Sequence, residues 1–114
     1  MQNTVSLNSN HEFRRLYQKG KSAVSPFLAV YCRKKKYGAR RLGITVSTKV
    51  GKAVVRNRVR RRIREAYRLH ELQFCEHVDV VIVARVRCVR ASFQQIEKSL
   101  LQLAEQLGLL KEPN

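Results

Sequence analysis

The densest run of chemically capable side chains lies between Val55 and Arg64, where arginine stands at almost every other position. Guanidinium groups stay charged in any environment, and their planar forks donate paired hydrogen bonds to phosphate oxygens. A solvated helix face would normally interleave glutamate with such cations, but Glu65 is the only acidic residue nearby. The run therefore predicts a surface that binds a nucleic-acid backbone.

The charge of the whole chain favours the same partner. Its 114 residues include 24 Lys and Arg against 8 Asp and Glu, a formal net charge of +16, and a polyanion would relieve this self-repulsion. No run approaches the roughly 18 apolar residues of a membrane span, and residues 1–10 lack the apolar segment of a signal peptide. We therefore expect a cytoplasmic RNA-binding protein with no membrane contact. The length suits one domain over residues 1–114, ordered at about 8–110.

A second set of side chains could stack on unpaired bases. It comprises the aromatic residues Phe13, Tyr17, Phe27 and Tyr31 and the basic residues Arg14 and Lys21. Phe13 and Tyr17 are one helical turn apart, and strand alternation puts Phe27 and Tyr31 on one face. Aromatic faces stack on bases without sequence preference, while the cations could follow the phosphates. The same rings could instead fill the core, and the pattern alone leaves both interpretations open.

Hydrolysis by the protein itself is not indicated. Two-metal chemistry needs several carboxylates to hold the ions about 4 Å apart, but Asp79 is the only aspartate and stands in an apolar run. The three histidines and three cysteines show no spacing typical of an acid–base pair, a zinc site or a disulfide framework. We expect no metal or other cofactor bound by the protein alone.

Periodicity and capping patterns predict the elements that would position these side chains. The predicted helices span residues 9–20, 52–70 and 92–108, and the predicted strands span 27–33, 41–47 and 78–84. The last strand is apolar enough for burial on both faces, residues 33–38 are typical of a basic hairpin turn, and Gly20 and Gly108 suit the position after a helix. We expect a two-layer α+β sandwich of order α-β-β-β-α-β-α, the additional short strand falling in the second β region.

Apolar and basic side chains separate along residues 52–70. At about 100° per residue, one side of the helix is formed by Val55, Val59, Ile63, Ala66 and Tyr67. The opposite side is formed by Asn57, Arg60, Arg61, Arg64 and Arg68. Arg56 projects into the apolar arc, so we expect either that its stem lies on apolar surface at the helix start while its charge reaches water, or that the local geometry differs from a regular helix.

The stretch from Gly43 to Tyr67, with Arg56-Asn57-Arg58 after a strand and a turn containing Lys and Gly, resembles the signature of the bacterial ribonuclease P protein family. Residues 13–20 and 78–85 also match in order and spacing, and the likeness covers roughly residues 8–108. The resemblance implies three helices on a four-stranded sheet. It also implies a left-handed strand-helix-strand crossover, against the general preference for the right hand.

The resemblance further implies partners. The family's protein binds a catalytic RNA and the 5′ leader of precursor tRNA and assists endonucleolytic removal of the leader, so we expect a 1:1 complex with that RNA, with Mg²⁺ held mainly by the RNA. The residues implied to bind the catalytic RNA are Lys49, Lys52, Arg56, Asn57, Arg58, Arg60, Arg61, Arg64 and Arg68. Those implied to form the leader-binding cleft are Phe13, Tyr17, Phe27, Tyr31, Arg14 and Lys21. A structural or assembly protein on ribosomal RNA is the alternative, and an independent nuclease is a third possibility.

Overall fold

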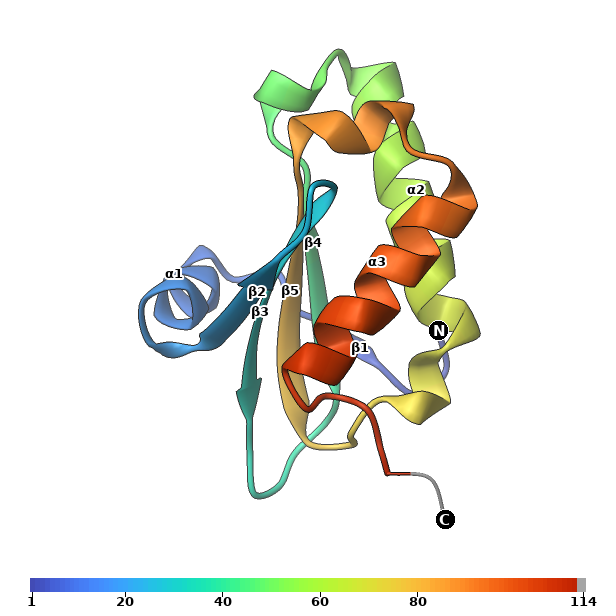
Figure 1. The fold of residues 1–114 in the computed structure, drawn as a ribbon. Coiled ribbons are helices and arrows are strands. Elements are labelled where there is room, and N and C mark those ends of the chain that lie inside the picture. Colours follow the sequence, from blue (N-terminus) through green and yellow to red (C-terminus); the bar gives the residue numbers. More distant parts are fainter. Residues whose placement is uncertain (113–114) are drawn as a thin grey trace.

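The computed structural model describes residues 1–112 as one mixed sheet with helices on both faces (Figure 1). The strands are β1 (Val5–Ser6), β2 (Lys21–Val24), β3 (Leu28–Lys34), β4 (Arg41–Thr45) and β5 (Val78–Ala84). The helices are α1 (Asn10–Lys19), α2 (Ala53–Leu69) and α3 (Phe93–Gln106), with the short 3₁₀ turns η1 (Thr48–Val50), η2 (Glu71–Gln73) and η3 (Val86–Arg90). The α+β class is confirmed.

Two strands differ from the prediction. The additional strand of the α-β-β-β-α-β-α order is β2, which precedes residue 27 rather than following it. A further strand, β1, lies before the predicted start of order at residue 8 and pairs in parallel with β4, so the sheet has five strands instead of four. The polar sequence of residues 1–10 gave no periodic signal for it.

The sheet order is β1-β4-β5-β3-β2, with β5 in the centre. Every residue of β5 except Val83 is buried, and only a central position covers both faces of such a strand. Because β5 pairs with β3 on one side and with β4 on the other, the hairpin predicted at residues 33–38 was wrong. That segment instead leads from β3 to β4, two strands that have β5 between them.

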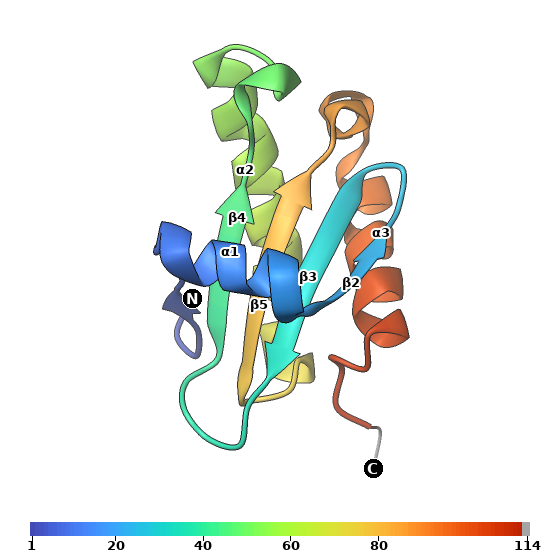
Figure 2. The ribbon, with the colours of Figure 1, turned by 90° about the vertical axis from the view of Figure 1, so that its left-hand side faces the viewer.

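The crossover from β4 through α2 to β5 is left-handed, as the resemblance implied. β4 and β5 are parallel. Figure 2 shows both strands pointing upward, with α2 behind the sheet and β5 to the right of β4, which is the left-handed arrangement. Helices α2 and α3 thus cover one face of the sheet, and α1 crosses the other face (Figure 1).

The helix ends confirm most of the capping predictions. Ser92 and Gln95 form a complete capping box at α3, and Gly108 has a φ of +70° after that helix. Gly20 differs, because its φ of −77° is open to any residue. A Cβ there would lie 2.6 Å from the Leu16 carbonyl oxygen and 2.7 Å from that of Cys32, so close backbone packing requires glycine. The predicted ordered part ends at about residue 110; beyond it the Lys111 amide donates to the Gln73 carbonyl, and residues 113–114 lie outside the described part.

The apolar residues form two cores of unequal size on the two faces of the sheet. The larger core packs β3, β4 and β5 against α2 and α3 and includes Val59, Ile63 and Tyr67. The smaller core lies under α1 and is built on Leu7, Leu16 and Val81. A single ten-residue helix therefore covers the second face, which leaves side chains around it partly exposed.

Candidate nucleic-acid interface

Helix α2 is buried along one side and basic along the other. Val59, Ile63, Ala66 and Tyr67 are buried, as the periodicity predicted. The opposite side, called here the Arg face, consists of Asn57, Arg58, Arg60, Arg61, Arg64 and Arg68, with Lys49 and Lys52 at the start of the helix. All of these side chains are exposed except that of Arg60, which is half-buried. The structure thus brings the residues predicted to bind the catalytic RNA onto one surface, with the exception of Arg56.

Contacts within the Arg face decide which cations are free to bind. Arg60 Nη1 donates to Asn57 Oδ1 at 3.1 Å. Arg68 donates two hydrogen bonds to Glu65 and thereby lowers the pKa of that carboxyl. Within residues 1–112, Arg58, Arg61 and Arg64 have no ion-pair partner. These three guanidinium groups therefore offer charge that an external anion can pair.

Two arginines of α2 turn inward. The predicted inward position of Arg56 is confirmed, because the residue is half-buried and its Nε is buried without a hydrogen-bond partner among the described residues. Arg62 donates from Nη1 to the Ala91 carbonyl at 3.1 Å, which ties α2 to the segment before α3. Arg62 therefore has a packing role and lies apart from the Arg face.

Three of the four predicted aromatic residues meet under α1. Tyr17 on α1 and Tyr31 on β3 pack edge to face, with ring centroids 4.8 Å apart and an interplanar angle of 72°. Phe13 packs on the smaller core, and its ring fills the space over Gly43, where a Cβ would lie 2.6 Å from Cε1. Tyr17 is 41% exposed, whereas Phe13 and Tyr31 are half-buried. We use the name aromatic groove for this cluster of three rings, Phe13, Tyr17 and Tyr31, of which Tyr17 is the most accessible.

Phe27 lies elsewhere, and the alternation that placed it beside Tyr31 was wrong. The Ser25 hydroxyl accepts hydrogen bonds from the amides of Phe27 and Leu28, which forms a turn and starts β3 at Leu28. Since Phe27 precedes the strand, it does not follow the strand's alternation. Its ring packs against the larger core, on the far side of the sheet from the aromatic groove.

The two cations predicted for the cleft, Arg14 and Lys21, lie in different parts of the structure. Arg14 is exposed on α1. Lys21 is opposite Cys32 in the β2–β3 register, so both side chains share the face that α3 covers. Lys21 lines a hollow of about 270 Å³ at the edge of the sheet, together with Lys19, Arg33, Lys34 and Leu107. The structure therefore places Lys21 on the opposite face of the sheet from the aromatic groove.

A buried ion-pair network, which the sequence did not reveal, lies beneath the start of α1. Asp79 is 1% exposed and pairs with Arg33 at 3.0 Å, Lys35 at 2.8 Å and Arg41 at 2.8 Å. Arg41 also donates to both carboxylate oxygens of Glu12 on α1. Burial by itself would raise the pKa of Asp79, but hydrogen bonds and charges from Arg41 and Lys35 outweigh it and lower the pKa to about 2. The network fixes α1 to the sheet and, through it, the position of Tyr17.

Residues 1–112 contain no group of three His, Cys, Asp or Glu side chains placed to hold a metal ion. Within the same residues, no helix has the length and apolar character needed to cross a bilayer.

Comparison with known proteins gives one consistent result. A family model described as Ribonuclease P matches residues 1–108. A ribonuclease P protein component from Alkaliphilus oremlandii is 40% identical over 104 residues, 91% of each chain, and one from Clostridioides difficile is 43% identical over 107 residues, 93% of this chain and 94% of its own. The solved structure of the Staphylococcus aureus RNase P protein matches with a TM-score of 0.83 and 32% identity, over 93% of this chain and 97% of that chain.

The fold and its basic helix are thus those of an RNA-binding subunit of a ribonucleoprotein. The chain belongs to the ribonuclease P protein family, and the resemblance seen in the sequence is confirmed. It is a subunit of ribonuclease P, an endoribonuclease of tRNA processing. The comparisons give no support to the alternative of a structural protein on ribosomal RNA.

Proposed function

We propose that the Arg face binds the catalytic RNA of ribonuclease P and that the aromatic groove binds the 5′ leader of precursor tRNA. The observation that carries this proposal is the separation of the two surfaces: α2 and α1 lie on opposite sides of the sheet (Figure 1). With the sheet between them, each surface can contact a different RNA in the same complex.

The chemistry of each surface suits its partner. The unpaired guanidinium groups of Arg58, Arg61 and Arg64 project from a rigid helix, an arrangement that binds the phosphates of folded RNA. The Tyr17 ring is exposed next to Tyr31, and an unpaired base can stack on such a ring. Arg14 is exposed on the same helix and Lys21 is exposed at the sheet edge, and in this proposal both bind the leader phosphates.

The catalytic RNA supplies the chemistry in this proposal, with one protein per RNA in the cytoplasm. Mg²⁺ is held by oxygen ligands, which are typically one or two carboxylates together with phosphates and water. The oxygens of Asp79 and Glu12 are already held by arginine and lysine, so these carboxylates do not fit a metal. We therefore assign the Mg²⁺ ions mainly to the RNA.

The first arm of the test removes charge from the Arg face. Arg61→Ala with Arg64→Ala should weaken binding of the catalytic RNA at least about 10-fold and reduce the slope of log affinity against log salt by about 1 to 2, since each phosphate contact releases a counterion. The matched control is Lys36→Ala with Lys98→Ala, which removes two exposed charges outside both surfaces. Equal losses in the two double variants would contradict a specific role for α2.

The second arm tests the aromatic groove. Tyr17→Ala should weaken the binding of precursor tRNA relative to that of mature tRNA by about 1–3 kcal/mol, because only the precursor carries a leader that can stack. Tyr17→Phe keeps the ring and should retain the preference, and both variants should assemble normally with the catalytic RNA. If Tyr17→Ala is folded and its preference for precursor is unchanged, the aromatic residues only fill the core.

A further inference from the structure

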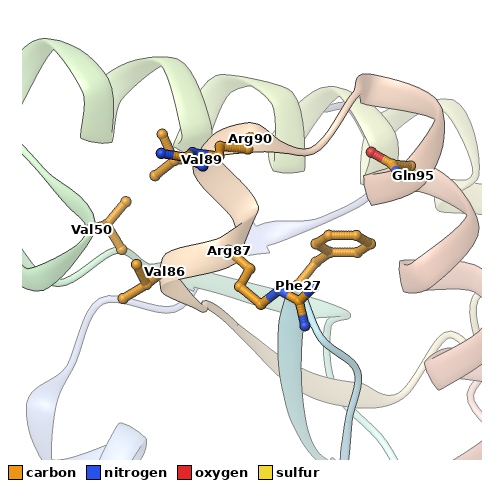
Figure 3. Close-up of a pocket in the computed structure, with 7 residues that line it drawn as sticks. All are labelled: Phe27, Val50, Val86, Arg87, Val89, Arg90 and Gln95. Carbon is orange, nitrogen blue, oxygen red and sulfur yellow. The ribbon is translucent and has the colours of Figure 1, made fainter.

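A hollow at the end of the sheet remains outside both proposed surfaces. Its volume is about 580 Å³, within the range of small-ligand sites. Its lining includes the apolar side chains of Phe27, Val50, Val86 and Val89 and the cations Arg87 and Arg90. In Figure 3 the Phe27 ring lies on one side and Val50 and Val86 on the other, with the Arg87 side chain between them. We call this hollow the η3 pocket.

The electrostatic surroundings of the η3 pocket are positive throughout. Residues 44–64 and 80–96, which form most of its neighbourhood, contain no Asp or Glu. Arg87 and Arg90 are exposed and have no ion-pair partner within residues 1–112. An adjoining hollow of about 300 Å³ shares Val50, Val86 and Arg87 and adds the cations Lys49 and Arg85. The charge is therefore complementary to a polyanion.

The pocket is also built on a fixed turn. Cys88 is fully buried and Ala91 is 3% exposed, which anchors η3 in the larger core. The hydrogen bond from Arg62 to the Ala91 carbonyl fastens the same segment to α2. Val86 is nonetheless 58% exposed, so an apolar surface remains open between the cations. An aromatic ring and aliphatic side chains within reach of two guanidinium groups match the two parts of a nucleotide, its base and its phosphates.

We propose that the η3 pocket holds one unpaired nucleotide of the catalytic RNA, with its base against Phe27, Val50 and Val86 and its flanking phosphates on Arg87 and Arg90. This inference rests on the proposed function, in which α2 binds the catalytic RNA. Val50 belongs to η1, which leads directly into α2 and carries Lys49, so the pocket continues the Arg face. The sheet separates it from the aromatic groove, which favours the catalytic RNA over the leader as its occupant.

The charge part of the proposal is tested with Arg87→Ala combined with Arg90→Ala. Affinity for the catalytic RNA should fall at least about 10-fold, and the salt slope should fall by about 1 to 2. Lys36→Ala with Lys98→Ala again controls for net charge. If both double variants lose the same affinity, the pocket has no specific role and the inference is wrong.

The base contact is tested with Phe27→Leu, which keeps apolar volume but removes the aromatic face. Affinity for the catalytic RNA should fall roughly 5- to 100-fold with an unchanged salt slope, because stacking releases no counterions. Chemical probing of base reactivity should show one nucleotide of the catalytic RNA protected by the unmodified protein and reactive again with Phe27→Leu. Urea unfolding of each variant verifies that it is folded at the assay temperature.

The outcomes separate this inference from the proposed function. If Arg61→Ala with Arg64→Ala weakens the catalytic RNA but the η3-pocket variants match their control and protect the same bases, the inference fails and the function stands. If the η3-pocket variants instead alter the preference for precursor over mature tRNA, the pocket holds the leader and the inference is also overturned. A loss of affinity together with renewed chemical reactivity of a single nucleotide supports the inference.

Discussion

Asp79 compensates three cations that would otherwise repel one another beneath α1. Its folded pKa of about 2 is below the unfolded value of about 3.8, so its ionisation stabilises the fold at any pH above about 4. That contribution is lost as the pH falls from about 4 to about 2, when the carboxyl takes up a proton in the folded state. This lowering of the Asp79 pKa corresponds to about 2 kcal/mol of folding free energy.

Asp79→Asn should therefore destabilise the protein by about 2–4 kcal/mol at pH 7, since it leaves Arg33, Lys35 and Arg41 without their counter-charge. The difference from the unmodified protein should shrink between pH 4 and pH 2 in urea unfolding. Glu76→Gln is the control, because Glu76 is exposed and, among residues 1–112, forms an ion pair only with Lys111, a pair expected to contribute less than about 1 kcal/mol. A difference in unfolding free energy that stays constant with pH would show that Asp79→Asn acts through altered packing and not through the loss of charge.

For individual residues, the sequence predicted which side chains are buried better than it predicted the groups with which they form ion pairs and hydrogen bonds. The apolar run around Asp79 indicated a buried acid, but strand pairing alone brings Arg33 and Arg41 to it from the two neighbouring strands. Arg40 is a stronger case: it is 5% exposed and donates to the carbonyls of Asn3, Phe74 and Cys75. Nothing in its local sequence distinguishes it from Arg41, because its acceptors are backbone atoms of distant segments.

For single helices and strands, periodicity was sufficient to predict which sides are buried. The apolar side of α2 and the doubly buried β5 were both predicted, because each pattern extends over several turns or alternations. Strand order was not predictable in this way. Residues 33–38 have the composition of a hairpin turn, and only the later strand β5, which needs the central position, shows that β3 and β4 are apart.

The fit of α1 onto β4 depends on Gly43. A Cβ at this position would lie 2.6 Å from the Phe13 ring and 2.9 Å from the Leu7 carbonyl oxygen. Gly43→Ala should cost about 1–3 kcal/mol through overpacking and displace α1. Because Tyr17 is on α1, the variant should lose preference for precursor over mature tRNA while its affinity for the catalytic RNA is retained.

The control for Gly43→Ala is Gly38→Ala, which lies in the exposed β3–β4 loop with a φ of +101°. It strains the backbone by about 1 kcal/mol or more without touching α1. Both proteins are compared by urea unfolding and by the ratio of precursor to mature tRNA affinity. An equal change of that ratio in both variants would mean that general destabilisation, not the position of α1, controls leader binding.

At the scale of the whole molecule, the charge of +16 acts in opposite directions on folding and on binding. In the free protein, uncompensated cations such as Arg58, Arg61 and Arg64 repel one another, and added salt screens this repulsion. In the complex the same cations pair with phosphates, and added salt weakens that attraction. The two effects of salt have opposite signs because the same cations repel one another in the free protein and attract phosphates in the complex.

Raising NaCl from 50 to 200 mM should therefore raise the Tm of the free protein but weaken its complex with the catalytic RNA by about 10³–10⁵, the effect expected for 6–10 phosphate contacts. Thermal unfolding and equilibrium binding measure the two quantities on the same preparation. Arg61→Ala with Arg64→Ala should reduce both salt effects together, since fewer like charges remain to repel or to bind. A nearly flat salt dependence of binding would show that the Arg face does not contact phosphates. A Tm that falls with salt would show that attraction within the folded chain, such as the pairs around Asp79, outweighs the repulsion among the exposed cations.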